Sequence, residues 1–106
     1  MLITATADTP KRPQVLRNGG AFMKSLYLGE WEKPRVVDGA SPQAYLVDQD
    51  PDTVVEPHYH QTEQWQVVVG GAGRLGKHAV GPVALHFTDP CTAYGPISPD
   101  AGSRIT

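Results

Sequence analysis

The chain has 106 residues, a formal net charge of -2 and a single cysteine, Cys91. This length suits one domain with one hydrophobic core. The charge gives no basic surface for nucleic acid, and no apolar run approaches the roughly 20 residues that span a bilayer. Met1–Pro13 lacks the pattern of a signal peptide, and a lone cysteine forms no internal disulfide. We therefore expect a cytoplasmic protein that binds neither nucleic acid nor membranes.

Frequent turn residues predict an all-β fold. The chain contains Gly 11 and Pro 10, which is above the average share of about an eighth for the two together. Such a high content of turn residues favours short strands over helices, and no segment shows a helical period long enough to predict a helix. We predict at least seven strands and little or no helix.

The first 20 residues have weak periodicity and are interrupted by Pro10 and Pro13. They are predicted to form an N-terminal arm that lies against the main domain, residues 21–106, or against a partner subunit. The first strand of the main domain is predicted over 21–28, where apolar and polar residues alternate loosely before Gly29.

Further strands are predicted between clusters of turn residues. The strongest is Gln64–Val69, and Gly70-Gly71 is expected to form a hairpin turn that leads into a return strand over 72–80. The other predicted strands are 44–47, 83–88 and 91–97.

One stretch, 56–71, carries the candidate chemistry. In an extended strand, residues two apart leave the same face, so His58 and His60 should point the same way. Two imidazoles with a nearby carboxylate, Glu63, form a donor set that suits Fe, Mn, Ni, Cu or Zn. The competing interpretation is that both histidines lie on a polar surface strand.

The residues from His58 to Gly70 resemble the first motif of the cupin superfamily. That motif has two histidines separated by one residue, then a glutamate, then six residues and a glycine. His58-Tyr59-His60 matches the first part, and Glu63 lies seven residues before Gly70. Only two residues separate His60 from Glu63, where the family has three or four, so Gln64 is the alternative ligand.

Strand alternation bears on this choice. Glu63, Trp65, Val67 and Val69 share one face, which we predict to be the interior of a barrel because it is the more apolar face. This favours Glu63 as the metal ligand and leaves Gln64 as the alternative, turned inward by a strand bulge.

The second cupin motif matches less well. Where the family has its last histidine ligand, this chain has Tyr94. Tyr94 is predicted to face the pocket near the two histidines, as a ligand or as an acid–base group, and His86 on the preceding strand is a second acid–base candidate. The alternative for Tyr94 is a packing role with its hydroxyl bonded to the backbone.

The resemblance implies a small antiparallel β-barrel of jelly-roll type, a double-stranded β-helix, that forms a homodimer. It also implies a divalent transition metal and a small-molecule ligand or substrate, with chemistry of the dioxygenase, lyase or isomerase type. The alternative is a non-catalytic ligand-binding or sensory module, and a structural role is a third possibility, since the fold does not choose among them.

Overall fold

The computed structural model describes residues 6–31 and 42–106, and this part of the chain is all-β. Its eight strands are β1 (Lys11–Val15), β2 (Ala21–Leu28), β3 (Ala44–Asp48), β4 (Gln64–Val67), β5 (Gly73–Leu75), β6 (His78–Val80), β7 (Leu85–Thr88) and β8 (Ile97–Pro99). The prediction of at least seven strands is confirmed. Within the two described ranges there is no helix, so none that would be long and apolar enough to cross a bilayer.

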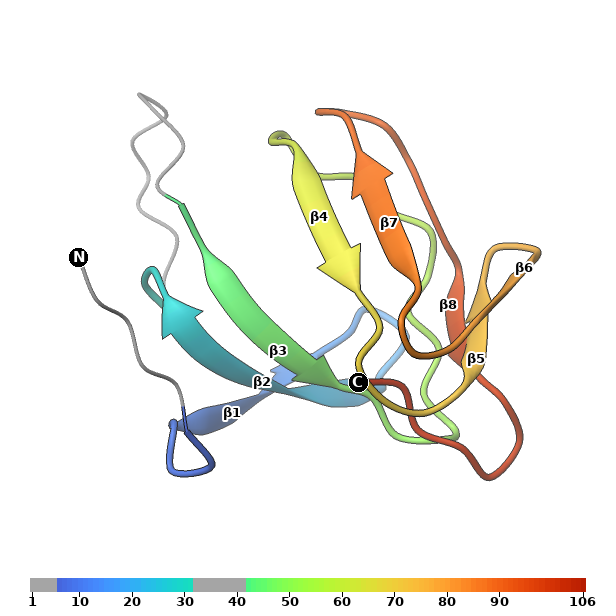
Figure 1. The fold of residues 1–106 in the computed structure, drawn as a ribbon, viewed down its shortest axis with the longest axis horizontal. Coiled ribbons are helices and arrows are strands. Elements are labelled where there is room, and N and C mark those ends of the chain that lie inside the picture. The colour runs from blue at the N-terminus through green and yellow to red at the C-terminus, as the bar shows by residue number, and fades with distance from the viewer. Residues whose placement is uncertain (1–5, 32–41) are drawn as a thin grey trace.

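The strands form three antiparallel sheets, in the orders β1-β2-β3, β4-β7 and β6-β5-β8 (Figure 1). Isolated bridges connect them at Gln49 and Ile105, Val55 and Ile97, His58 and Tyr94, and Gly71 and Ile105. Among the described strands, β3 pairs only with β2 and β4 pairs only with β7, so these strands do not close into a barrel.

Strand β1 lies within the stretch predicted to be an arm. It pairs with β2 along its whole length, from Lys11 opposite Ser25 to Val15 opposite Ala21. All five of its residues are exposed. Residues 11–15 of the predicted arm therefore form an edge strand that lies against β2 of the main domain.

The expected hairpin at Gly70-Gly71 is wrong, and so is the single strand over 72–80. Strand β4 pairs with β7, and the glycine pair leads instead into a different sheet. Segment 72–80 folds back on itself at Gly76-Lys77, because Leu75 pairs with His78 and Gly76 adopts a left-handed φ of 58°. A glycine adopts that φ without a steric cost, so the β5–β6 hairpin forms at this two-residue turn and not at Gly70-Gly71.

The C-terminal segment, residues 104–106, hydrogen-bonds to Gln49 after β3 and to residues 69–72 between β4 and β5, beside a small core. Among the described residues, the buried apolar side chains are Val55 and Ile105, and the side chain of Gln49 is only 2% exposed. The Gln49 amide donates hydrogen bonds to the carbonyls of Thr53 and of Ile97, the latter at 3.0 Å. Its backbone pairs with Ile105 through bonds of 2.8 and 3.1 Å. A buried amide is tolerated here because its donors are satisfied.

Gly71 lies in the link between β4 and β5, at the point where this link contacts the backbone of the C-terminal segment. It has a φ of 79°, and a methyl group on its Cα would overlap the Arg104 carbonyl oxygen. We expect Gly71→Ala to lower the free energy of unfolding by about 3 kcal/mol or more, because backbone cannot move aside as a side chain can.

Gly19→Ala is the matched control for that denaturant-unfolding measurement. Gly19 has a similar φ of 85°, but nothing lies within 4 Å of the added carbon. The free energy of unfolding of Gly19→Ala should fall by only the roughly 1 kcal/mol that an alanine in the left-handed backbone conformation costs. Equal losses for the two variants would contradict the assignment of Gly71 as a packing constraint.

A histidine and tyrosine cluster beside an open pocket

His58 and His60 lie on an extended segment that runs antiparallel to 91–94. His58 and Tyr94 exchange backbone hydrogen bonds of 3.0 and 2.9 Å, and the His60 carbonyl accepts one of 2.7 Å from Cys91. The prediction that the two imidazoles point the same way is confirmed, since both Nε2 atoms approach a single atom, the hydroxyl oxygen of Tyr94.

The Tyr94 hydroxyl is the centre of this cluster. It lies 3.0 Å from His58 Nε2, 3.2 Å from His60 Nε2 and 3.1 Å from Gln66 Nε2. The orientation predicted from sequence is therefore confirmed: the hydroxyl faces both histidines. These partners of the hydroxyl are all side chains, which disagrees with a packing tyrosine bonded to the backbone.

The hydrogen-bond network defines which atoms carry protons. His58 Nδ1 lies 2.9 Å from the Glu56 carbonyl, which only accepts, so Nδ1 is the donor and Nε2 of the neutral ring keeps its lone pair. The Tyr94 hydroxyl thus donates to His58 Nε2. Its oxygen then accepts from the Gln66 amide and from His60 Nε2.

His86 joins the cluster through Gln66. On β7, the His86 Nδ1 lies 3.0 Å from Gln66 Oε1 and 3.4 Å from Thr88 Oγ1. An amide oxygen accepts, so Nδ1 donates and Nε2 is the unprotonated atom of the neutral ring. The His86 ring centroid lies 5.1 Å from that of Tyr94. The two acid–base candidates are therefore neighbours.

The predicted interior face of β4 is wrong. Trp65 and Val67 are 64% and 47% exposed, whereas Gln64 and Gln66 are half-buried on the side of the cluster. The polar face turns inward because the Gln66 amide bonds to both Tyr94 and His86 there.

This orientation separates the two candidate ligands. Glu63 is exposed and lies on the outward side by alternation, so the structure offers no support for the preference for it. Gln64 lies on the inward side without any bulge, and its side-chain hydrogen bond acts on Tyr94. Across 6–31 and 42–106, no three His, Cys, Asp or Glu side chains are grouped so that they could hold a metal ion.

The phenol of Tyr94 resists ionisation. Burial, followed by the charge of Tyr45 on β3, raises its pKa from 10.0 to about 12, although hydrogen bonds from Gln66 and Gln64 oppose the shift. In the metal-free protein at neutral pH, Tyr94 is therefore a hydrogen-bond donor rather than a phenolate.

This raised pKa predicts a loss of stability at alkaline pH. The folded state holds the Tyr94 proton more tightly than the unfolded state, so the contribution is complete below pH 10.0 and is lost as pH rises toward about 12. Phenolate absorbance followed against pH should show a late step that Tyr94→Phe makes smaller by one tyrosine, the remainder coming from Tyr45, whose pKa burial also raises. A late step of unchanged size in that variant would refute the assignment.

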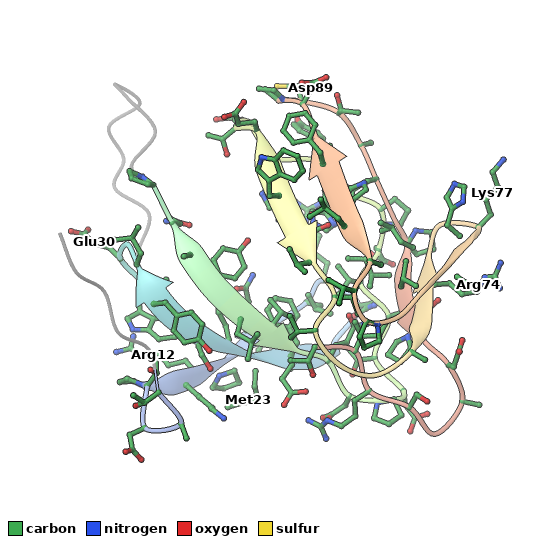
Figure 2. The ribbon with its side chains drawn as sticks, viewed as in Figure 1. Arg12, Met23, Glu30, Arg74, Lys77 and Asp89 are labelled. Carbon is green, nitrogen blue, oxygen red and sulfur yellow. The ribbon has the colours of Figure 1, made fainter. Side chains whose placement is uncertain are left out.

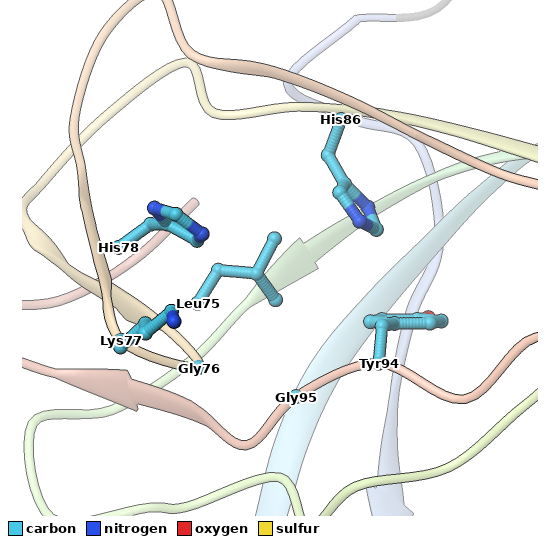
Figure 3. Close-up of a pocket in the computed structure, with 7 residues that line it drawn as sticks. All are labelled: Leu75, Gly76, Lys77, His78, His86, Tyr94 and Gly95. Atoms are coloured by element: carbon cyan, nitrogen blue, oxygen red, sulfur yellow. The ribbon is translucent and has the colours of Figure 1, made fainter.

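A cavity of about 520 Å³ lies beside the cluster. Its lining residues are Leu75, Gly76, Lys77, His78, His86, Tyr94 and Gly95. Figure 3 shows Leu75, Lys77 and His78 on one side of it and His86 and Tyr94 on the other. The lining contains basic groups and no carboxylate, in a chain whose net charge is -2.

Sequence reasoning missed Gln66, which links Tyr94 to His86, and also Tyr45 and Lys77. The signal for Gln66 was its alternation with Gln64, two amides on one face of a strand flanked by histidines. Tyr45 carried no such signal, because its approach to Tyr94 depends on how two sheets meet.

Comparisons of the chain with protein-family models, with curated proteins and with solved structures found no match. The functional assignment therefore rests on the residues and geometry described above.

Proposed function

We propose that this protein is a cupin-like metal-binding protein whose pocket takes a small organic anion. The observation that carries the proposal is the convergence of two imidazole Nε2 atoms on one oxygen, at 3.0 and 3.2 Å. Paired imidazoles on one extended segment are a common way for a protein to hold a transition metal.

The donor set fits such an ion. His58 donates its Nδ1 proton to the Glu56 carbonyl, and metal-binding histidines usually make this second hydrogen bond because it fixes the ring and leaves Nε2 as the ligand atom. His58 and His60 would hold the ion through their Nε2 atoms, His60 after moving its proton from Nε2 to Nδ1, with Gln64 and the Tyr94 oxygen as the remaining inward-facing donors. Imidazole donors favour Zn, Cu, Fe or Ni over Mg or Ca.

A bound ion would supply Lewis acidity for polarising a carbonyl or carboxyl oxygen. The chain's own groups supply the rest. Tyr94 is a neutral proton donor at the pocket wall, and His86 presents an unprotonated Nε2 beside it. This arrangement supports acid–base chemistry of the lyase or isomerase type.

The charges of the site favour an anionic ligand. None of the inward donors is a carboxylate, so a divalent ion held here would keep its positive charge. Lys77 and His78 line the same cavity. A carboxylate on a small molecule would meet both the ion and these basic side chains, which makes small organic acids the best-supported ligand class.

The second candidate is a metal-independent binding module. It is favoured by the raised pKa of Tyr94, which opposes a phenolate ligand, and by the outward position of Glu63. In that case Tyr94, Gln66 and His86 would form a fixed polar wall against which the ligand is oriented.

We also propose that the strands belong to an incomplete jelly-roll barrel of the double-stranded β-helix type and that the protein works in the cytoplasm. The supporting observations are the bridges that join the three sheets and the unpaired, exposed Cys91, which suits a reducing compartment.

One titration series tests the function. Calorimetry with Zn²⁺ and Ni²⁺ on the chelator-treated protein should show one site per chain, and malonate should then bind more tightly than its neutral analogue malonamide. Malonate binding that is equal with and without metal would support the second candidate. The absence of both metal and malonate binding would reject both.

A further inference from the structure

The paired strands β4 and β7 are polar on the inside and apolar on the outside. Trp65 lies opposite Phe87 and Val67 opposite Leu85, and this face continues to Val69 and Val83. The backbone pairing extends in that direction too, since Val68 donates to the Ala84 carbonyl at 2.9 Å. The face thus has three tiers, one of aromatic residues and two of aliphatic residues.

All six side chains of this face, which we call the β4–β7 outer face, are exposed. Their exposed fractions are Trp65 64%, Val67 47%, Val69 57%, Val83 82%, Leu85 63% and Phe87 41%. With full side-chain areas of roughly 150–250 Å² for the large residues, about 600 Å² of apolar surface is open, the upper limit for a monomer. An ordinary half-buried sheet turns its apolar face inward and its polar face to solvent, and the β4–β7 sheet has the opposite arrangement.

We propose that the β4–β7 outer face packs against the same face of a second copy of this chain. Two such faces would bury about 1,200 Å² in total, which clears the roughly 1,000 Å² that a specific interface needs. The face carries no charged side chain, and the chain's net charge of -2 gives only weak repulsion between copies. The same patch on both subunits makes a closed two-fold dimer.

Size and charge define the orientation of the two copies. Glu63 precedes β4 and Asp89 follows β7, so both carboxylates flank the aromatic end, and Figure 2 shows Asp89 beyond the tip of β7. The two-fold axis would lie in the plane of the interface, perpendicular to the strands, and pass through the Val67 tier. The strands of the two copies then run in opposite directions, which places the two acidic ends far apart. The same axis sets the Trp65 ring against the partner's Val69 and Val83, large against small.

The dimer also affects the pocket, although it does not require the proposed function. Gln66 and His86 alternate with the residues of the outer face on the same two strands. Packing on the outer face would therefore hold the strands that position the His86 and Tyr94 side of the cavity.

The test is sedimentation of the 106-residue wild-type chain and of two variants over a range of concentrations. Leu85→Glu places a carboxylate at the centre of the face and should raise the dimer dissociation constant at least about 100-fold, since it occurs twice in the interface. Val15→Glu, at a position 74% exposed on β1 in another sheet, should leave the constant unchanged. Circular dichroism should show both variants folded, because both positions are exposed.

Three results would overturn the proposal. These are a wild-type chain that stays monomeric at millimolar concentration, a dimer that Leu85→Glu does not weaken, and a dimer that Val15→Glu weakens equally. The first result includes the case in which another part of the same chain covers the face. In a Trp31→Phe background, emission from Trp65 should shift to longer wavelength on dilution as the face becomes exposed, and a constant emission would also count against it.

Discussion

Replacing both His58 and His60 with alanine is expected to abolish metal uptake while leaving the fold intact. The two imidazoles supply the nitrogen donors of the cluster, and losing a mere hydrogen-bond partner of a ligand already costs about 10–100-fold in affinity. Both side chains are only half-buried, at a bridge between strands rather than in the core around Val55 and Ile105. Elemental analysis after dialysis against Zn²⁺, with circular dichroism, measures both effects.

His78→Ala is the control for that experiment. His78 lines the cavity, but it comes from the β5–β6 hairpin and is not among the side chains that hydrogen-bond to the Tyr94 hydroxyl at 3.0–3.2 Å. The His78→Ala variant should bind as much metal as the wild type and should bind only an anionic ligand more weakly. Metal occupancy in the double variant equal to that of the wild type would reject a site at His58 and His60, whatever the ligand does.

The sequence predicted the class of fold because turn residues and alternation are local signals. Strand β2 occupies the range predicted for it, 21–28, and β3 contains the predicted 44–47. Pairing was harder to predict, since it depends on which strands meet. The Gly70-Gly71 pair looked like a hairpin turn, but Gly71 is required by the close approach of the Arg104 carbonyl.

The site was predicted in part. Two-residue spacing correctly placed His58 and His60 on one side, and the side to which Tyr94 points agrees with what the resemblance to the second cupin motif led us to expect. The face of β4 was misjudged because apolar residues were assumed to point inward. That assumption fails in a sheet whose inner face carries a polar network and whose apolar face is exposed. A single sequence does not distinguish such a sheet from one whose apolar face is buried.

The Tyr94→Phe variant separates a working tyrosine from a packing one. The change keeps the ring and removes one oxygen that lies within 3.2 Å of three side-chain nitrogens. Because those groups remain accessible to water in a half-exposed cluster, we expect a loss of only about 1–2 kcal/mol in the free energy of unfolding. If the oxygen is a ligand, Zn²⁺ affinity should fall by far more than this stability change explains.

Tyr59→Phe is the matched control, because Tyr59 lies between the two histidines and its side chain is 60% exposed. It should change neither stability nor affinity. The direction of the Tyr94→Phe effect distinguishes the possible roles of the hydroxyl. The hydroxyl donates to His58 Nε2, so if it only occupies that lone pair, its removal should raise metal affinity. A fall in affinity assigns the oxygen to the metal, and unchanged affinity with the same loss of stability would leave Tyr94 a structural residue.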